Sequence, residues 1–507
     1  MKSKENKLSR RKAIGYVGIG ALAMHFSSAS FARKEYRPFF KEPLHYLTIS
    51  EIGELIKSKK ISSLELTQTM LARIRVVDNT LKSYTTIMSE QALSKAKDLD
   101  NELAKGKHRG PLHGIPIGIK DLLYTRGVRT MAGTMALADF IPEFNATVVT
   151  RLEEAGAVVL GKLALCEGAF SPYHPKFQVP VNPWDATRWS GVSSSGSGVA
   201  TAAGLCFGSI GTDTGGSIRY PSAVNGCVGL KPTYGRVSRF GVFGLAESMD
   251  HVGPMTRTVE DAAIMFEAMA GKDSNDPTSL ATPVQKIRDG LSLGVSGLRI
   301  GFDRHYATNN VDTEVAEAIV SVLKELTRQG AKVVDVKMPD ITEIGGAWYN
   351  ICIVEAVLAN ANTYPSKAAD YGPGFRAELE NGLKVSGIEF AKACKVRAVF
   401  TTQIKQLLET VDCFVCPAMS NTAYKKIADP YARETDDTWA TVEPNDIYTK
   451  PFNFSGSPTL SVPCGFSSEG LPIGVQFVGS DLNEAMICRI GYAYETHTEW
   501  HKRHPNI

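Results

Sequence analysis

Residues 190–219 read SGVSSSGSGVATAAGLCFGSIGTDTGGSIR, and they set the expectation for the whole architecture. A cluster of serines and glycines comes first, followed by the helix-like residues 199–205 and by an apolar run typical of a buried strand. The segment closes on the glycine-rich residues 211–219, which contain a single serine, Ser217. A flexible Gly/Ser linker would not lead directly into a helix and a buried strand. We therefore predict that both serine-containing segments belong to a folded core.

The glycines beside these hydroxyl groups indicate chemistry as well as structure. Glycine permits backbone angles that let consecutive N–H groups converge on one point, and an oxyanion hole is built in this way. A Ser-His-Asp hydrolase would carry its nucleophile in a GxSxG elbow, and neither serine cluster has that form. If one of these serines is a nucleophile, another kind of group must take its proton.

Around this segment, short apolar runs broken by glycine and proline alternate with helical patterns. Upstream, residues 48–77 repeat apolar side chains at helical spacing, and Ser62 with Glu65 forms a capping box that starts a helix. Thr258 with Asp261 caps another. Strands are expected at residues 115–119, 158–160, 205–210 and 298–302, and helices at 147–154 and 314–329. This alternation predicts an α/β fold, with a central sheet buried on both faces.

The composition is that of a globular protein. The chain has 507 residues, of which 43% are hydrophobic and 21% charged, and this is too little charge for a disordered chain. The formal net charge is only +3 and the Lys and Arg residues are spread along the sequence, so nucleic acid is not expected as a partner. The nine cysteines are odd in number and scattered, which does not suggest a disulfide framework.

Residues 1–32 are expected to be a signal peptide. A basic opening is followed by the apolar residues 13–26 and by SFA at residues 30–32, a small-x-small cleavage pattern. The apolar run is shorter than the roughly 18 residues that span a bilayer, so a stable membrane anchor is not expected. Arg10 and Arg11 resemble a twin-arginine signal, which predicts export to the periplasm or the medium. A basic N-terminal helix that stays in the cytosol is the alternative.

Three segments resemble motifs for nucleotide, metal or redox binding, but each lacks a residue or partner that the motif requires. Residues 156–163, GAVVLGKL, lack the hydroxyl that a P-loop supplies to Mg²⁺, because Leu163 stands in its place. HTEWH at residues 497–501 is not the HExxH zinc motif. Cys413 and Cys416 have redox or zinc spacing, but they lie in an apolar run without a second pair at ligand distance. We expect neither a metal nor an organic cofactor.

Several motifs occur together and in a set order. They are GIPIGIKD at residues 114–121, SGVSSSGSG at 190–198, GTDTGGSIR at 211–219 with Pro221, GLKPTYGR at 229–236 and GLPIGVQ at 470–476. With these motifs the chain resembles the amidase signature family over residues 48–492. The resemblance implies a single large α/β amidase domain, residues 33–507, with a mixed central sheet covered on both faces by helices and a core signature region at about 106–270. Variable insertions are expected at about 271–295 and 420–448.

By this resemblance Ser217 matches the nucleophile, Ser193 the bridging serine and Lys120 the base. Ser193 is selected from its serine neighbours because it stands 24 residues before Ser217, which matches the family's interval. Val192 and Ser195 occupy positions where the family often has glycine, and Val192 would be strained if its φ were positive.

A lysine can act as a base only when it is neutral, and burial beside uncharged hydroxyls favours that form by lowering its pKa. We therefore expect Lys120 to be buried and to relay protons through Ser193 to Ser217. The oxyanion hole is expected to consist of the backbone N–H groups of Thr214, Gly215, Gly216 and Ser217.

Supporting roles are expected for residues that flank the nucleophile. Ser194 would hydrogen-bond to Lys120, while Asp213 and Arg219 would pair across the turn that presents Ser217. Some aromatic residues would line an acyl pocket, although core packing explains such residues at least as often. They are Trp348, Tyr349, Tyr424, Trp439 and Phe454.

The expected protein is an exported serine hydrolase that cleaves the C–N bond of a small amide to a carboxylic acid and ammonia or an amine. One alternative is the A subunit of a glutamine-dependent tRNA amidotransferase, which GLKPTYGR followed by VSR at residues 237–239 resembles. Its tRNA substrate is cytosolic, so the leader argues against it. Another alternative is a binding protein of the same fold without turnover. The identity of the amide, activity on esters or cyclic amides, and the oligomeric state, including a homodimer, stay open.

Overall fold

The computed structural model describes residues 42–170, 172–426 and 447–507. The chain divides into two units, residues 1–46 and residues 47–507. The first unit contains the short 3-10 helix η1 (Leu44–Tyr46). The predicted signal peptide, residues 1–32, lies outside the described residues, which begin at residue 42. The second unit contains all the other described elements.

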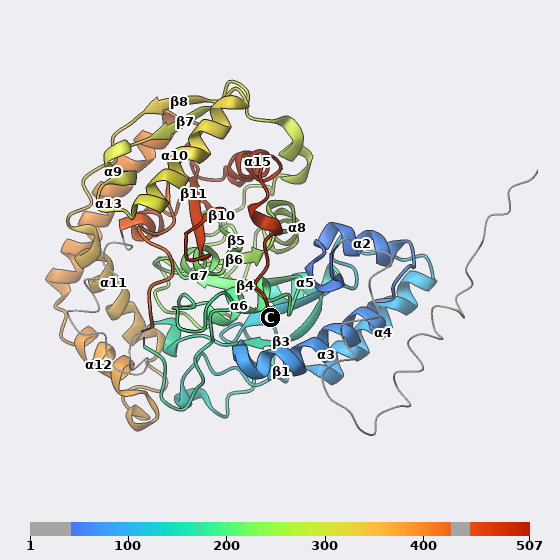
Figure 1. Cartoon of the computed structure of the whole chain (residues 1–507). Helices are drawn as coiled ribbons and strands as arrows, with labels where there is room; N and C mark the ends of the chain where they lie inside the picture. Colours follow the sequence, from blue (N-terminus) through green and yellow to red (C-terminus); the bar gives the residue numbers. More distant parts are fainter. Residues whose placement is uncertain (1–41, 171, 427–446) are drawn as a thin grey trace, which may run out of the picture. The chain divides into compact units, whose positions relative to one another are not determined.

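An 11-stranded mixed sheet forms the centre of the second unit, in the order β1-β3-β2-β4-β6-β5-β10-β11-β9-β7-β8 (Figure 1). β2 pairs in parallel with both β3 and β4, so the carboxyl ends of these strands meet at one edge. The strands are β1 (Tyr84–Ile87), β2 (Pro116–Lys120), β3 (Val158–Leu163), β4 (Gly208–Asp213), β5 (Val228–Lys231), β6 (His251–Thr256), β7 (Arg299–Phe302), β8 (Lys332–Asp335), β9 (Cys413–Pro417), β10 (Thr459–Phe466) and β11 (Pro472–Val478).

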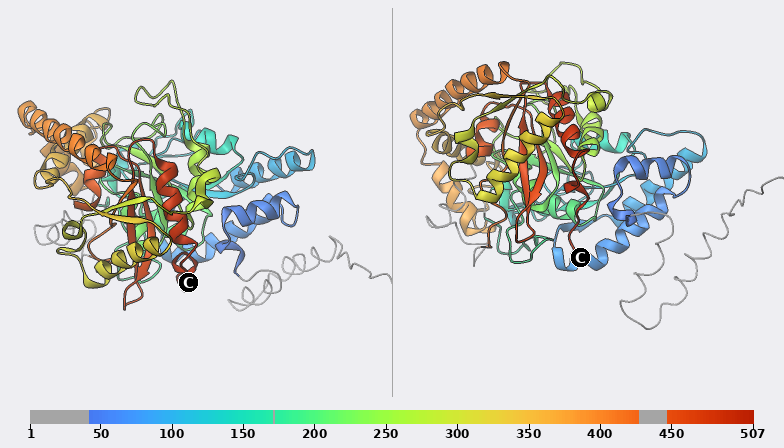
Figure 2. Two further views of the ribbon diagram at one scale, coloured as in Figure 1. Left: turned by 90° about the horizontal axis from the view of Figure 1, so that it is seen from above. Right: turned by 45° about the horizontal axis from the view of Figure 1, so that its top comes forward.

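Helices cover the sheet, as the sequence predicted. Every residue of β2, β4 and β6 is buried, and because successive side chains point to opposite faces, both faces of these strands are covered. α11, α12 and α13 pack together as one group (Figure 2). Among the described residues, no helix combines the length and apolar character needed to cross a bilayer.

The α-helices are α2 (Ile49–Lys57), α3 (Ser63–Leu81), α4 (Ser89–Ala104), α5 (Thr147–Glu154), α6 (Ser195–Ala202), α7 (Arg219–Asn225), α8 (Val259–Met269), α9 (Arg304–Thr308), α10 (Thr313–Arg328), α11 (Ile344–Ala359), α12 (Pro373–Gly382), α13 (Gly387–Glu409) and α15 (Glu484–Glu495). Further 3-10 helices are η2 (Met135–Leu137), η3 (Glu167–Ala169), η4 (Arg288–Leu293), η5 (Ala368–Asp370) and η6 (Trp500–Lys502).

Most of the predicted elements are confirmed. The capping box of Ser62 and Glu65 starts α3, and the Thr258 side chain caps α8. The strand predicted at residues 205–210 lies further along the chain, because β4 spans Gly208–Asp213. Pairing with β6 carries the strand through Thr212 and Asp213, polar residues that a hydrophobic pattern does not count. This displacement matters because both residues belong to the candidate site.

The glycines of the first serine cluster have a different role from the one predicted. Gly196 and Gly198 lie inside α6, so they do not form a loop of converging N–H groups. A Cβ at Gly196 would lie 2.5 Å from the backbone nitrogen of Ala164, which follows β3. These glycines therefore let α6 approach its neighbours closely, and this packing overrides glycine's low helix propensity.

Candidate active site

Lys120 is the last residue of β2, and its side chain is fully buried. Its Nζ donates hydrogen bonds to Ser193 Oγ at 2.7 Å and to Thr212 Oγ1 at 2.8 Å. Thr212 lies on the neighbouring strand β4, where the parallel pairing of β2 and β4 brings it beside the lysine. The expected burial of Lys120 and its contact with Ser193 are both present. Thr212 is a partner that the sequence analysis missed.

Burial prepares Lys120 to accept a proton near neutral pH. Removal from water lowers the pKa of the amine from 10.5 to about 7, and the negative charges of Asp213 and Asp250 offset only part of this change. Because both hydrogen-bond partners are neutral hydroxyls, no ion pair holds the proton on the amine. Burial therefore favours the uncharged form of Lys120 at a pH well below that at which an exposed lysine loses its proton.

Ser194 ties the two serine-bearing loops together rather than contacting the lysine. Its Oγ donates to the Thr212 carbonyl at 3.2 Å, and its N–H donates to the Ser217 carbonyl at 3.2 Å. The predicted hydrogen bond from Ser194 to Lys120 is replaced by the Thr212 hydroxyl. The Val192–Ser193 peptide bond is cis, and neither Val192 nor Ser195 has a positive φ.

The Asp213 carboxylate organises the turn that carries Ser217. Oδ1 accepts the Gly216 N–H at 2.9 Å and Oδ2 accepts the Ile218 N–H at 3.0 Å. Arg219 donates to the same oxygens, from Nη2 at 2.8 Å and from Nε at 3.0 Å, and both side chains are fully buried. Burial alone would raise the pKa of Asp213, but the charge and hydrogen bonds of Arg219 hold that pKa below its usual value. The predicted pair across the turn is therefore present.

The predicted oxyanion hole needs one correction. The Gly216 N–H donates to Asp213, so it does not point toward a substrate. Within the described parts of the chain, the N–H groups of Thr214, Gly215 and Ser217 have no acceptor. Ser217 is partly exposed whereas its neighbours in the turn are buried, so it is the residue of residues 211–220 that solvent can reach.

The aromatic residues considered for an acyl pocket separate into distinct environments. Trp348, on α11, donates its indole N–H to the Thr214 carbonyl at 2.9 Å and so lies against the turn. Tyr424 stacks on Trp189 with ring centroids 4.6 Å apart. The Tyr349 hydroxyl donates to Glu378, the Phe454 ring lies 6.0 Å from the Arg397 guanidinium, and Trp439 lies outside the described residues.

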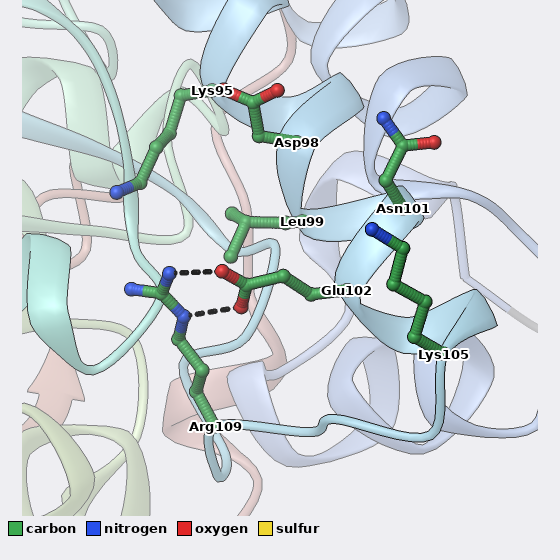
Figure 3. Close-up of a pocket in the computed structure, with 7 residues that line it drawn as sticks. All are labelled: Lys95, Asp98, Leu99, Asn101, Glu102, Lys105 and Arg109. Atoms are coloured by element: carbon green, nitrogen blue, oxygen red, sulfur yellow. Dashed lines mark hydrogen bonds and ion pairs between the residues drawn. The ribbon is translucent and has the colours of Figure 1, made fainter.

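Two pockets formed by the described residues are not lined by Lys120, Ser193 or Ser217. A cavity of about 1050 Å³ is lined by α11 and by residues of the segment 239–250, including Asp250, which accepts the Thr214 hydroxyl. A smaller, charged pocket of about 380 Å³ lies on α4, where Arg109 and Glu102 form a two-bond ion pair (Figure 3). Among the described residues, no group of His, Cys, Asp and Glu is arranged to hold a metal ion.

Comparisons with known proteins find amidases and an amidotransferase subunit among the similar chains. A family profile described as Amidase matches residues 65–488. The Mycobacterium tuberculosis protein "Putative amidase AmiD" is 42% identical over 474 residues, covering 92% of this chain and 97% of that protein. The A subunit of glutamyl-tRNA(Gln) amidotransferase from Desulfatibacillum aliphaticivorans is 37% identical over 493 residues, covering 92% and 100%. The structure of native peptide amidase from Stenotrophomonas maltophilia is similar with a TM-score of 0.78, at 30% identity, covering 90% of this chain and 98% of that one.

The buried ion pair predicts a large stability loss when one partner is removed. Arg219→Met should lower the free energy of unfolding by about 3 kcal/mol or more, because it leaves the Asp213 carboxylate buried without a counter-charge. Urea denaturation measures this. Arg328→Met is the matched control, since Arg328 pairs with Glu325 at the surface and should matter little. Equal losses in the two variants would contradict the assignment.

Proposed function

The chain belongs to the amidase family, and from this premise we propose that it is a serine amidohydrolase acting through an acyl-enzyme on Ser217. It cleaves a carboxamide C–N bond and releases a carboxylic acid and ammonia or an amine. The observation that carries the proposal is the buried Lys120 amine, which has a lowered pKa and is hydrogen-bonded to Ser193. No metal or organic cofactor is part of the proposed reaction.

In the proposed reaction the proton moves along a chain of neutral groups. As Ser217 Oγ attacks the amide carbon, its proton passes to Ser193 Oγ while the Ser193 proton passes to the neutral amine of Lys120. The carbonyl oxygen becomes an oxyanion, which the N–H groups of the turn stabilise. The proton then returns by the same route to the leaving nitrogen as the C–N bond breaks. Water attacks the ester and restores Ser217.

The family supports a second candidate function. The A subunit of glutamyl-tRNA(Gln) amidotransferase is a relative that matches almost the whole chain, and the residues 229–239 resemble it as well. In that case the protein would release ammonia from glutamine for a tRNA-dependent partner. Co-expression with partner amidotransferase subunits and charged tRNA distinguishes the two functions, because only an amidotransferase component would then support transamidation.

Covalent labelling tests the nucleophile and excludes a silent binding protein. A fluorophosphonate should label the wild type on Ser217, and Ser217→Ala should lose both the label and nearly all amidase activity. Lys120→Ala should lose nearly all activity, and Ser193→Ala several powers of ten, because the relay acts as one unit. Intact-mass spectrometry and turnover of a panel of aliphatic, aryl and peptide amides measure these effects. Undiminished labelling of Ser217→Ala would refute the assignment.

The pH dependence of the rate, compared between the wild type and one variant, tests Lys120 as the base. Because Lys120 must be neutral, the acylation rate should rise with pH and level off above about pH 7, where its amine loses the proton. Lys231 is also buried, with its pKa lowered to about 7. The pH at which the rising limb of the rate profile levels off therefore does not by itself identify the base. Thr212→Val resolves the ambiguity. It removes an acceptor that favours the charged amine of Lys120, so the limb should move to lower pH.

The result that would contradict Lys120 as the base is a limb that stays in place in Thr212→Val. Such a result would assign the titration to another group, of which Lys231 is the first to test. Its Nζ donates to the Ser457 carbonyl at 2.6 Å rather than to Thr212. Thermal unfolding of the variant serves as a check that the fold is retained.

We also propose that the protein is exported, on the basis of the leader sequence. Arg10→Lys combined with Arg11→Lys should leave the precursor in the cytosol of a bacterium that has the twin-arginine pathway, because that pathway reads the arginine pair. Lys2→Arg combined with Lys4→Arg keeps the same charge and should be exported normally. Cell fractionation and immunoblotting measure the outcome, and equal export of both variants would contradict the proposal.

A further inference from the structure

Two side chains distant in sequence hold the carbonyl groups of the turn before Ser217. The indole N–H of Trp348 donates to the Thr214 carbonyl at 2.9 Å, and the hydroxyl of Thr449 donates to the Gly215 carbonyl at 2.6 Å. Neither contact belongs to the proton relay. Both contacts instead fix the orientation of peptide units in the turn.

The orientation of a trans peptide matters because its C=O and the following N–H point in opposite directions. The peptide bonds of this turn are trans. Holding the Gly215 carbonyl therefore directs the Gly216 N–H the other way, where it meets Asp213. Holding the Thr214 carbonyl likewise directs the Gly215 N–H. Unlike that of Gly216, the Gly215 N–H has no acceptor among the described residues.

We infer that Trp348 is a positioning residue for the oxyanion hole: its indole N–H holds the Thr214 carbonyl so that the Gly215 N–H faces the reacting carbonyl oxygen. The inference rests on the proposed function, because it needs Ser217 as the nucleophile. Trp348 is not assigned contact with the reacting atoms. It acts through the peptide unit between Thr214 and Gly215.

The indole is well placed for such a role because its own position is fixed. Trp348 is buried, the Phe170 ring stacks on it with centroids 6.2 Å apart, and Lys450 Nζ lies 4.2 Å from its ring centre. A Cβ on Gly215 would lie only 2.6 Å from Cζ2 of the indole. The φ of Gly215 is not positive, so its backbone conformation alone does not require glycine. Contact with Trp348 instead explains why residue 215 has no side chain.

The test separates binding from the chemical step. In phosphonylation by a fluorophosphonate, negative charge develops on the phosphoryl oxygen, so the maximal labelling rate reports on the oxyanion hole. Trp348→Phe should lower this maximal rate by about tenfold to a hundredfold. This decrease does not exceed the one expected when an oxyanion-hole donor is removed altogether, because the Gly215 N–H is displaced rather than lost. The probe concentration giving half-maximal rate should change by less than about threefold, because ground-state binding does not use the Gly215 N–H.

Trp184→Phe is a matched control. Trp184 also donates its indole N–H to a backbone carbonyl, that of Asn225 at 2.8 Å, but at the end of α7 rather than in the turn. This variant should label at the wild-type rate. Replacement of Trp348 by 3-benzothienylalanine keeps the shape of the ring and removes only the N–H, so it keeps the test valid if Trp348→Phe folds poorly.

The outcomes distinguish the two proposals. If the wild type is not labelled on Ser217, the proposed function fails. If the wild type is labelled and the benzothienyl variant reacts at the same maximal rate, the proposed function stands and the role of Trp348 is refuted. A slower maximal rate with unchanged half-saturation and an unchanged thermal midpoint supports the inference, because a loss of fold would lower the labelled fraction and the midpoint together.

Discussion

The geometry of the candidate site depends on the carboxylate of Asp213. This buried group accepts the N–H groups of Gly216 and Ile218 and a two-bond contact from Arg219. A buried carboxylate without a counter-charge would be strongly unfavourable, so the turn can hold Asp213 in this place only because Arg219 is there too. The backbone carbonyl of Asp213 is also held, by the Asn453 side chain at 3.1 Å, so the residue is fixed at both ends.

Arg219 and Lys120 are both fully buried basic side chains of the site, but burial affects their charge differently. Arg219 faces a carboxylate, and a guanidinium keeps its proton in proteins, so this pair stays ionic and structural. Among the described residues Lys120 hydrogen-bonds only to hydroxyl groups, so burial outweighs the nearby negative charges, lowers its pKa and makes the neutral form available. The fold thus places an arginine where a permanent charge stabilises the turn, and a lysine where the proposed reaction needs a group that takes up and releases a proton.

The sequence predicts the local parts of this site better than the distant ones. The Asp213–Arg219 pair lies within one short motif, whereas the proximity of Lys120 and Ser193 was expected only because the chain resembles the amidase signature family. Thr212 was missed because the predicted strand ended at residue 210, whereas β4 continues to Asp213 and its parallel pairing with β2 brings Thr212 to the end of β2. The contact from Trp348 could not be predicted, because it joins residues 134 positions apart through the packing of α11 on the turn. The role of the glycines in α6 was likewise invisible, because it depends on what packs against them.

The two glycines before Ser217, Gly215 and Gly216, are present for different structural reasons. Gly216 has a φ of +134°, a conformation that side chains rarely adopt, and its N–H stabilises the turn by donating to Asp213. Gly215 needs no unusual φ, but the indole of Trp348 occupies the space that a Cβ would take. One glycine is therefore required by the backbone and the other by a neighbour. Because consecutive peptides in this turn are held in different directions, the Gly216 N–H supports the turn, while the N–H groups of Gly215 and Ser217 have no acceptor among the described residues.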